Sequence, residues 1–181
     1  MNGLFRSFLA ATAALMLLAA APATAQEEDA DAEAGAGAKT TTETIGSWTV
    51  TCSEGSKGKR CIIQQRLATK EKRQVVASAT IRLTQEGGAE LIIAMPTGVV
   101  IGPGMALAVD GEEAAKAAFR TCGPRACQAA VIIDQDLINK LAKGTALGAT
   151  VQTLRGKPLG LQFTLEGFTK AYAAFKKGVT Q

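Results

Sequence analysis

The chain has 181 residues, of which 47% are hydrophobic, 20% are charged and 4% are aromatic, and its formal net charge is +4. This length suits one domain of ordinary size. The chain contains no histidine, which excludes a Ser-His-Asp triad, a Cys-His dyad and any metal site with imidazole ligands. The abundance of leucine, isoleucine and valine, with charges of both signs, also excludes a wholly disordered or collagen-like chain.

The first 25 residues have the features of a secretory signal peptide. Arg6 supplies a positive charge, residues 8–20 are apolar apart from one threonine, and Ala23-Thr24-Ala25 offers the small residues that signal peptidase accepts. As a helix the apolar run would extend about 20 Å, which is shorter than the roughly 30 Å hydrocarbon core of a bilayer. We therefore expect cleavage after Ala25, no transmembrane segment, and a periplasmic or secreted protein.

Residues 26–43 differ sharply in composition from the rest of the chain. They include six acidic residues, one lysine and no large apolar side chain. Such a segment buries too little apolar surface to offset the entropy lost on ordering, so we expect a disordered acidic linker. Binding of a partner by this linker is the alternative interpretation. The remaining domain, residues 44–181, carries 18 basic and 10 acidic residues, so a basic domain follows an acidic linker.

Alternation of apolar and polar residues with period two is the main pattern of the domain. In residues 48–52, for example, Trp48, Val50 and Cys52 share one face and two threonines take the other. The same alternation predicts strands at 73–84, 91–95, 105–109, 127–133, 147–154 and 159–165. We expect a mainly β fold, an antiparallel β-sandwich or barrel-like domain of about eight strands.

Two segments have helical spacing instead. Residues 136–143 place three apolar side chains on one face, with Asp134 or Asp136 as N-cap and Gly144 at the end. Residues 168–175 carry a mostly aromatic stripe with the same spacing, and we expect the helix to end at Lys176-Lys177-Gly178. We therefore predict one short internal helix and one C-terminal helix whose stripe faces the core; docking of a partner on the stripe is the alternative.

The four cysteines all follow the expected cleavage site, and an oxidising compartment favours disulfides. A polar hairpin centred near Ser56-Lys57 would place Cys52 directly opposite Cys61, and Cys122 and Cys127 enclose a tight turn. We predict these two local disulfides, each contributing roughly 2 to 3 kcal/mol.

Two other roles for the cysteines were considered. A redox-active pair beginning at Cys122 would need its partner three residues on, at the start of a helix. A zinc site of four thiolates would favour closer Cys-x-x-Cys spacing. Structural disulfides are therefore the favoured interpretation.

Six basic residues define a candidate interaction patch. Three lie at one expected hairpin tip and three in the next loop: Lys57, Lys59, Arg60, Lys70, Lys72 and Arg73. Such charge suits an anionic lipid, a glycan or a nucleic acid. Because no aromatic residues are interleaved with these charges, we expect no nucleic acid partner. Simple solvated charge is the alternative, and no catalytic, cofactor or metal site is predicted.

The order of several short motifs resembles that of the invasion-associated locus B family of exported Gram-negative proteins. The matching pieces are Gly46 to Cys52, Cys61 with Gln64-Gln65, Met95 to Val99 with Gly104, Val109-Asp110-Gly111, Cys122 with Cys127-Gln128-Ala129, and Phe163 to Ala171. Together they cover about residues 45–176. The match departs from the family pattern at Ser47 and Thr164, where an acidic residue and a serine are common. The resemblance implies a small β-rich envelope or secreted protein, with entry into host cells as the role associated with some pathogen members, and it implies no catalytic residues.

Three functional hypotheses follow. We expect a non-enzymatic cell-envelope protein that contacts an unknown envelope or host-surface component, as a monomer or weak homo-oligomer, with host adhesion or invasion as its role in a pathogen. A periplasmic chaperone or inhibitor would instead use an open strand edge or an apolar groove. A carboxylate-based glycan hydrolase would need two carboxylates about 5 to 9.5 Å apart across a cleft.

Overall fold

The computed structural model describes residues 39–56, 58–69, 71 and 74–180. These residues form ten strands and two helices. In chain order they are β1 (Lys39–Ile45), β2 (Trp48–Gly55), β3 (Gly58–Ala68), β4 (Val75–Leu83), β5 (Ala89–Met95), β6 (Met105–Val109), β7 (Glu112–Cys122), β8 (Cys127–Ile133), α1 (Gln135–Lys143), β9 (Ala146–Gln152), β10 (Pro158–Thr164) and α2 (Phe168–Thr180). In the part of the chain so described, no helix is long and apolar enough to cross a membrane.

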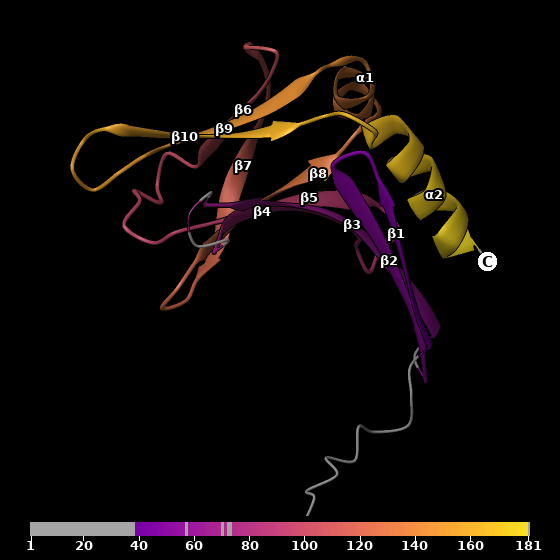
Figure 1. Cartoon of the computed structure of the whole chain (residues 1–181). Helices are drawn as coiled ribbons and strands as arrows, with labels where there is room; N and C mark the ends of the chain where they lie inside the picture. Colours follow the sequence, from indigo (N-terminus) through magenta and orange to yellow (C-terminus); the bar gives the residue numbers. More distant parts are fainter. Residues whose placement is uncertain (1–38, 57, 70, 72–73, 181) are drawn as a thin grey trace, which may run out of the picture. The chain divides into compact units, whose positions relative to one another are not determined.

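All the strand pairs are antiparallel, in the order β1-β2-β3-β4-β5-β8-β7-β6-β9-β10. Strand β7 divides this sheet into two layers, because its first half pairs with β6 and its second half pairs with β8. In Figure 1 β7 runs from the layer of β6, β9 and β10 to the layer of β1–β5 and β8. The expectation of an antiparallel, sandwich-like fold is therefore confirmed.

The inner faces of the two layers pack against each other. Both layers contribute side chains that are almost completely buried: Ile63, Ile81, Leu91 and Ile93 from one, and Leu107, Leu147, Ala149 and Phe163 from the other. In each of these strands the buried residues alternate with more exposed ones. The period-two pattern in the sequence thus corresponds to one core between two layers.

Strand β1 lies partly within the segment expected to be a disordered linker. Residues Lys39 to Glu43 belong to this strand and pair with β2, with Thr42 opposite Thr51. Threonine is β-branched and suits a half-exposed strand, so these residues pair although they bury almost nothing. The expected signal peptide and residues 26–38 lie outside the described residues.

Strand β7 is another element that alternation did not indicate. Its sequence, EEAAKAAFRTC, is rich in residues that favour helix. It is nevertheless a strand, because its first half pairs with β6 and its second half pairs with β8. Pairing with neighbours overrides local propensity here.

Both helices lie at one end of the two layers (Figure 1). Asp134 is the N-cap of α1, since its carboxylate accepts a hydrogen bond from the Leu137 N–H (2.8 Å), and Gly144 follows the last turn as expected. The aromatic stripe of α2 faces the core: the ring of Phe168 meets that of Trp48 edge to face at 5.4 Å. Helix α2 therefore covers β2 and β3.

The expected end of α2 at Gly178 is wrong, because the helix continues to Thr180. Gly178 lies directly on the Cys52–Cys61 disulfide: a Cβ atom at this position would be 2.7 Å from the Cys61 sulfur and 2.8 Å from the Cys52 sulfur. Real Cβ atoms do not approach this closely. Glycine is required at this position to let the helix pack on the disulfide.

We predict that Gly178→Ala lowers the free energy of unfolding of the oxidised protein by about 1 to 3 kcal/mol, because the added methyl group overpacks a rigid contact. In a Cys52→Ala/Cys61→Ala background the same change should be neutral or stabilising by up to about 1 kcal/mol, since the sulfur atoms are gone and alanine favours helix. Urea unfolding of the four proteins measures this coupling. An equal loss in both backgrounds would contradict the assigned contact.

The turn between β6 and β7 is a two-residue hairpin in which Asp110 and Gly111 both have positive φ (51° and 89°). The Asp110 carboxylate accepts hydrogen bonds from the Thr145 N–H and hydroxyl and from the Ala146 N–H (2.6 to 3.1 Å). These hydrogen bonds lower the pKa of Asp110 below its ordinary value, and the bond from the Thr145 hydroxyl has the largest effect. The carboxylate therefore fixes this turn to the start of β9.

We predict that Asp110→Asn lowers the midpoint of thermal unfolding at neutral pH and that this difference disappears in acid. Because the pKa of Asp110 is lower in the folded chain, the stabilisation is complete above the pKa of the unfolded chain and is lost as the pH falls through the folded value. Asparagine tolerates positive φ, so the turn itself is preserved. Melting curves between about pH 7 and pH 2 test this, with Glu112→Gln as a control that removes the same charge from the same turn.

Candidate interaction surface

The structure contains both expected disulfides, Cys52–Cys61 and Cys122–Cys127. Cys52 and Cys61 stand directly opposite each other in the β2–β3 hairpin, and both are largely buried beneath α2. Cys122 and Cys127 close the β7–β8 turn, in which the Gly123 N–H also donates to the Ala126 carbonyl (2.8 Å). Each disulfide thus reinforces a hairpin that backbone pairing already forms.

The environment of the second disulfide is unlike that of a redox-active dithiol. Cys122 ends one strand and Cys127 begins the next, so neither lies at the start of a helix, where a thiol pKa is lowered. In the described residues no cysteine is free and no group of three or more metal-binding side chains comes together. All four sulfur atoms are in S–S bonds and none is available as a thiolate ligand.

The structure describes two of the six basic residues of the expected patch, Lys59 and Arg60. Lys59 and Arg60 stand at the first end of β3, whereas Thr69 and Gln74, which flank the second loop and share a hydrogen bond (3.0 Å), stand at its other end. With 11 residues in β3 at about 3.3 Å each, the two ends of this strand are roughly 35 Å apart. The single patch stays a prediction. Its other members lie outside the described residues: Lys57, Lys70, Lys72 and Arg73.

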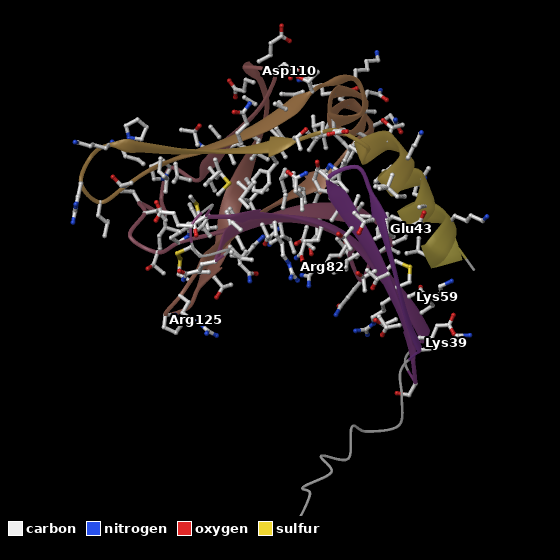
Figure 2. The ribbon with its side chains drawn as sticks, in the orientation of Figure 1. Lys39, Glu43, Lys59, Arg82, Asp110 and Arg125 are labelled. Atoms are coloured by element: carbon white, nitrogen blue, oxygen red, sulfur yellow. A yellow bond between two sulfur atoms is a disulfide. The ribbon has the colours of Figure 1, made fainter. Side chains whose placement is uncertain are left out.

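The β2–β3 hairpin tip keeps a positive charge of its own. Lys39 on β1 and Lys59 on β3 lie on either side of Glu54 on the same face, and Figure 2 shows both lysines at the end of the hairpin. Arg60 is exposed on the opposite face, across from Ser53. The described tip thus carries three cations and one anion.

Three hollows stand out on the surface of the described residues. The first, of about 600 Å³, is lined by Ser47, Gln65, Arg66, Leu67, Thr145, Ala146, Gln162 and Thr164. The second, of about 540 Å³, lies over the outer face of β6, β7 and β9 and has Glu113 as its one carboxylate. The third, of about 480 Å³, lies beside Arg125 and has none. None of the three presents the facing pair of carboxylates that a glycan hydrolase requires.

Gln65 is the buried polar residue at the first hollow, and the sequence analysis assigned it no role. Its side chain is 4% exposed, and its Nε2 donates to the carbonyls of Ser47 (3.2 Å) and Thr164 (3.0 Å). It therefore joins the β1–β2 turn to the end of β10. The alternation Cys61, Ile63, Gln65 could have shown that this polar side chain faces the core.

Comparison with known proteins now identifies the family. The model of the "Invasion associated locus B (IalB) protein" family matches residues 48–176. The chain belongs to the IalB family. An "Invasion protein B homolog" of Brucella abortus (strain 2308) is 29% identical over 133 residues, which are 73% of this chain and 77% of the relative. "Invasion protein B" of Bartonella bacilliformis is 28% identical over 134 residues, which are 72% of each chain.

The fold agrees with a solved structure of the same type. The crystal structure of invasion associated protein B from Bartonella henselae has a TM-score of 0.68 and 24% sequence identity, and the match covers 76% of this chain and 95% of that chain. The IalB match includes both disulfides, Gln65 and the aromatic stripe of α2. It does not include β1 or Gly178.

We predict that Gln65→Met lowers the free energy of unfolding by about 1 to 3 kcal/mol, because the carbonyls of Ser47 and Thr164 each lose a buried donor. Gln64→Met is the matched control. Gln64 is the neighbouring glutamine on the opposite side of β3, where it is half-buried and bonds to the Thr80 hydroxyl and the Arg66 Nε, so its replacement should cost less, about 0.5 to 1 kcal/mol. Denaturant unfolding of both variants tests the difference, and equal losses would show that Gln65 does not join the two turns.

Proposed function

We propose that this IalB-family protein is exported, is not an enzyme, and acts in the cell envelope through surface contacts. Two disulfides in a β scaffold carry the proposal, because structural disulfides persist in oxidising compartments. The predicted signal peptide over residues 1–25, with cleavage after Ala25, supports the same location. The relatives in Brucella and Bartonella are named for invasion, so we propose host adhesion or invasion as the role in a pathogen.

The three hollows described above lack a facing pair of carboxylates, which supports contact rather than catalysis. The exposed large apolar residues come from several elements, two of them from opposite ends of β4: Val75, Leu83, Ile101, Ile132 and Leu154. Scattered apolar residues do not make a hydrophobic docking groove. Polar and charged contacts are therefore favoured.

A periplasmic chaperone or inhibitor is the second candidate, and one observation favours it. Among the described strands, β1 and β10 are the two edges of the sheet, and each pairs with one strand. An extended peptide could add to such an edge through main-chain hydrogen bonds. Charged and threonine-rich β1 is the edge better protected against unspecific pairing.

The proposal is tested in intact cells of the source organism with the full chain carrying a C-terminal tag. We expect the mature protein to begin at Gln26, to appear in the periplasmic or extracellular fraction, to contain no free thiol, and to crosslink to an envelope or host-surface component. Neutralising the basic residues of the two loops, Lys57, Lys59 and Arg60 with Lys70, Lys72 and Arg73, should lower the crosslinking yield, because the patch is expected to supply the positive charge for contact.

N-terminal sequencing, fractionation and thiol labelling provide the measurements. Unprocessed protein in the cytoplasm with free thiols would overturn the proposed export. Turnover of an envelope glycan by the purified, oxidised protein would overturn the non-enzymatic role.

A further inference from the structure

The face of β1–β5 and β8 that points away from the core, which we name the outer sheet face, is polar on β1 and β2 and mixed on the other strands. Its apolar residues include Ile62, Ile92 and the exposed Ile132. On the first two strands it presents hydroxyl pairs: Thr40 opposite Ser53, Thr42 opposite Thr51 and Thr44 opposite Thr49. The last of these rows continues through Gln64 on β3 and Thr80 on β4. Hydroxyl and amide groups both donate and accept hydrogen bonds, as sugar hydroxyls do.

Charge on this face is mostly positive. Among the described residues it carries Arg60, Arg66 and Arg82 as cations and Glu90 as its one anion. Arg60 and Arg66 lie on the same strand, six residues or roughly 20 Å apart, and Arg82 on β4 lies opposite Ile62 between them. The positive charges are thus spread along the sheet rather than gathered at one point.

Two of the arginines are held in place by side-chain hydrogen bonds. The Arg66 Nε donates to the Gln64 Oε1 (2.6 Å), and the Gln64 Nε2 donates to the Thr80 hydroxyl (2.8 Å). The Arg82 Nε pairs with the Glu90 Oε1 (2.8 Å), while the Arg82 side chain remains 56% exposed. Since a guanidinium has five N–H donors, bonding through Nε leaves the terminal nitrogens for a partner. Prior ordering lowers the entropy cost of binding.

Figure 2 shows how this surface is bounded. Arg82 projects from the side of the sheet away from β6, β9 and β10, and Lys59 and Arg125 stand at the hairpin tips on either side of it. Those tips, of β2–β3 and β7–β8, extend beyond β4 and β5 on the same side in Figure 1. The face is therefore broad, bounded by cations at both ends, and open between them.

We propose that the outer sheet face binds an acidic polysaccharide, a chain of sugars bearing carboxylate or sulfate groups. This inference rests on the proposed surface-binding role and names the class of partner. Spread arginines fit charges repeated along an extended polymer, and the hydroxyl rows fit the sugar hydroxyls between them. No aromatic residue of β1–β5 or β8 stands on this face to stack with bases, which disfavours single-stranded nucleic acid. A single lipid headgroup cannot reach charges roughly 20 Å apart.

The test measures binding of the oxidised, exported chain to heparin as the sulfated probe and polygalacturonate as the carboxylated probe, at physiological salt. Arg66→Gln/Arg82→Gln should weaken binding about tenfold or more, because two charge-assisted contacts are lost. The matched control, Arg155→Gln/Lys157→Gln, removes two positive charges from the exposed β9–β10 turn and should change affinity by less than about twofold. Neutral dextran should not bind.

Equal loss in both double variants would overturn the inference, because attraction would then depend on total charge. Tighter, Arg66-dependent binding to vesicles containing anionic lipid, or to single-stranded DNA, would also overturn it. If neither polysaccharide binds while crosslinking in cells still captures a surface component, this inference fails and the proposed function stands. If the chain is not exported, the proposed function fails whatever the affinity.

Discussion

The structure depends on the contact between the β1–β2 turn and the junction of β10 with α2. Gly46 and Gly167 pass so close that a Cβ on either would lie 2.5 Å from a backbone oxygen of the other segment, Glu166 or Ile45. The Ser47 N–H donates to Glu166 (3.2 Å), and Trp48 Nε1 and Gln65 Nε2 both donate to the Thr164 carbonyl (3.1 and 3.0 Å). Since β1 and β10 are the two edges of the sheet, this contact joins the layers where no strand pairing does. Glycine is required at both positions, because each has positive φ and no room for a side chain.

That contact also places α2. Once Gly167 and Phe168 are fixed beside Trp48, the helix runs over β2 and β3 and reaches the Cys52–Cys61 disulfide at Gly178. The inner face of the β2–β3 hairpin, including its disulfide, is thereby covered by α2, while its outer face stays open. Burial of one face and exposure of the other explains why β2 and β3 show strict alternation.

Much of the fold could be predicted from the sequence wherever a single local feature, such as alternation, hairpin register or a helix cap, decides the structure. Alternation located β2, β4 and β8, hairpin register paired Cys52 with Cys61, and Asp134 was one of two candidates for the cap of α1. Prediction failed where distant contacts decided the outcome. The alanine-rich β7 is a strand because of neighbours on both sides, and Gly178 lies within α2 because a disulfide distant in sequence needs the space. The basic patch was inferred from proximity in sequence alone, and only Lys59 and Arg60, at the first end of β3, are among the described residues.

The inner and outer faces of the layer formed by β1–β5 and β8 differ in how freely their residues can be substituted. This difference bears on how a surface-binding protein can change its partner. Cores tolerate few changes, because most buried groups are packed or hydrogen-bonded, as the Gln65 Nε2 and the disulfide beneath Gly178 are. Arg66 and Gln64, one residue away on the other side of β3, contact mainly each other and Thr80. Substitutions on that side therefore alter charge and hydrogen bonding at little cost in stability. Because packing on the inner face stabilises the fold, the residues of the outer sheet face can change to suit the molecule that the protein binds.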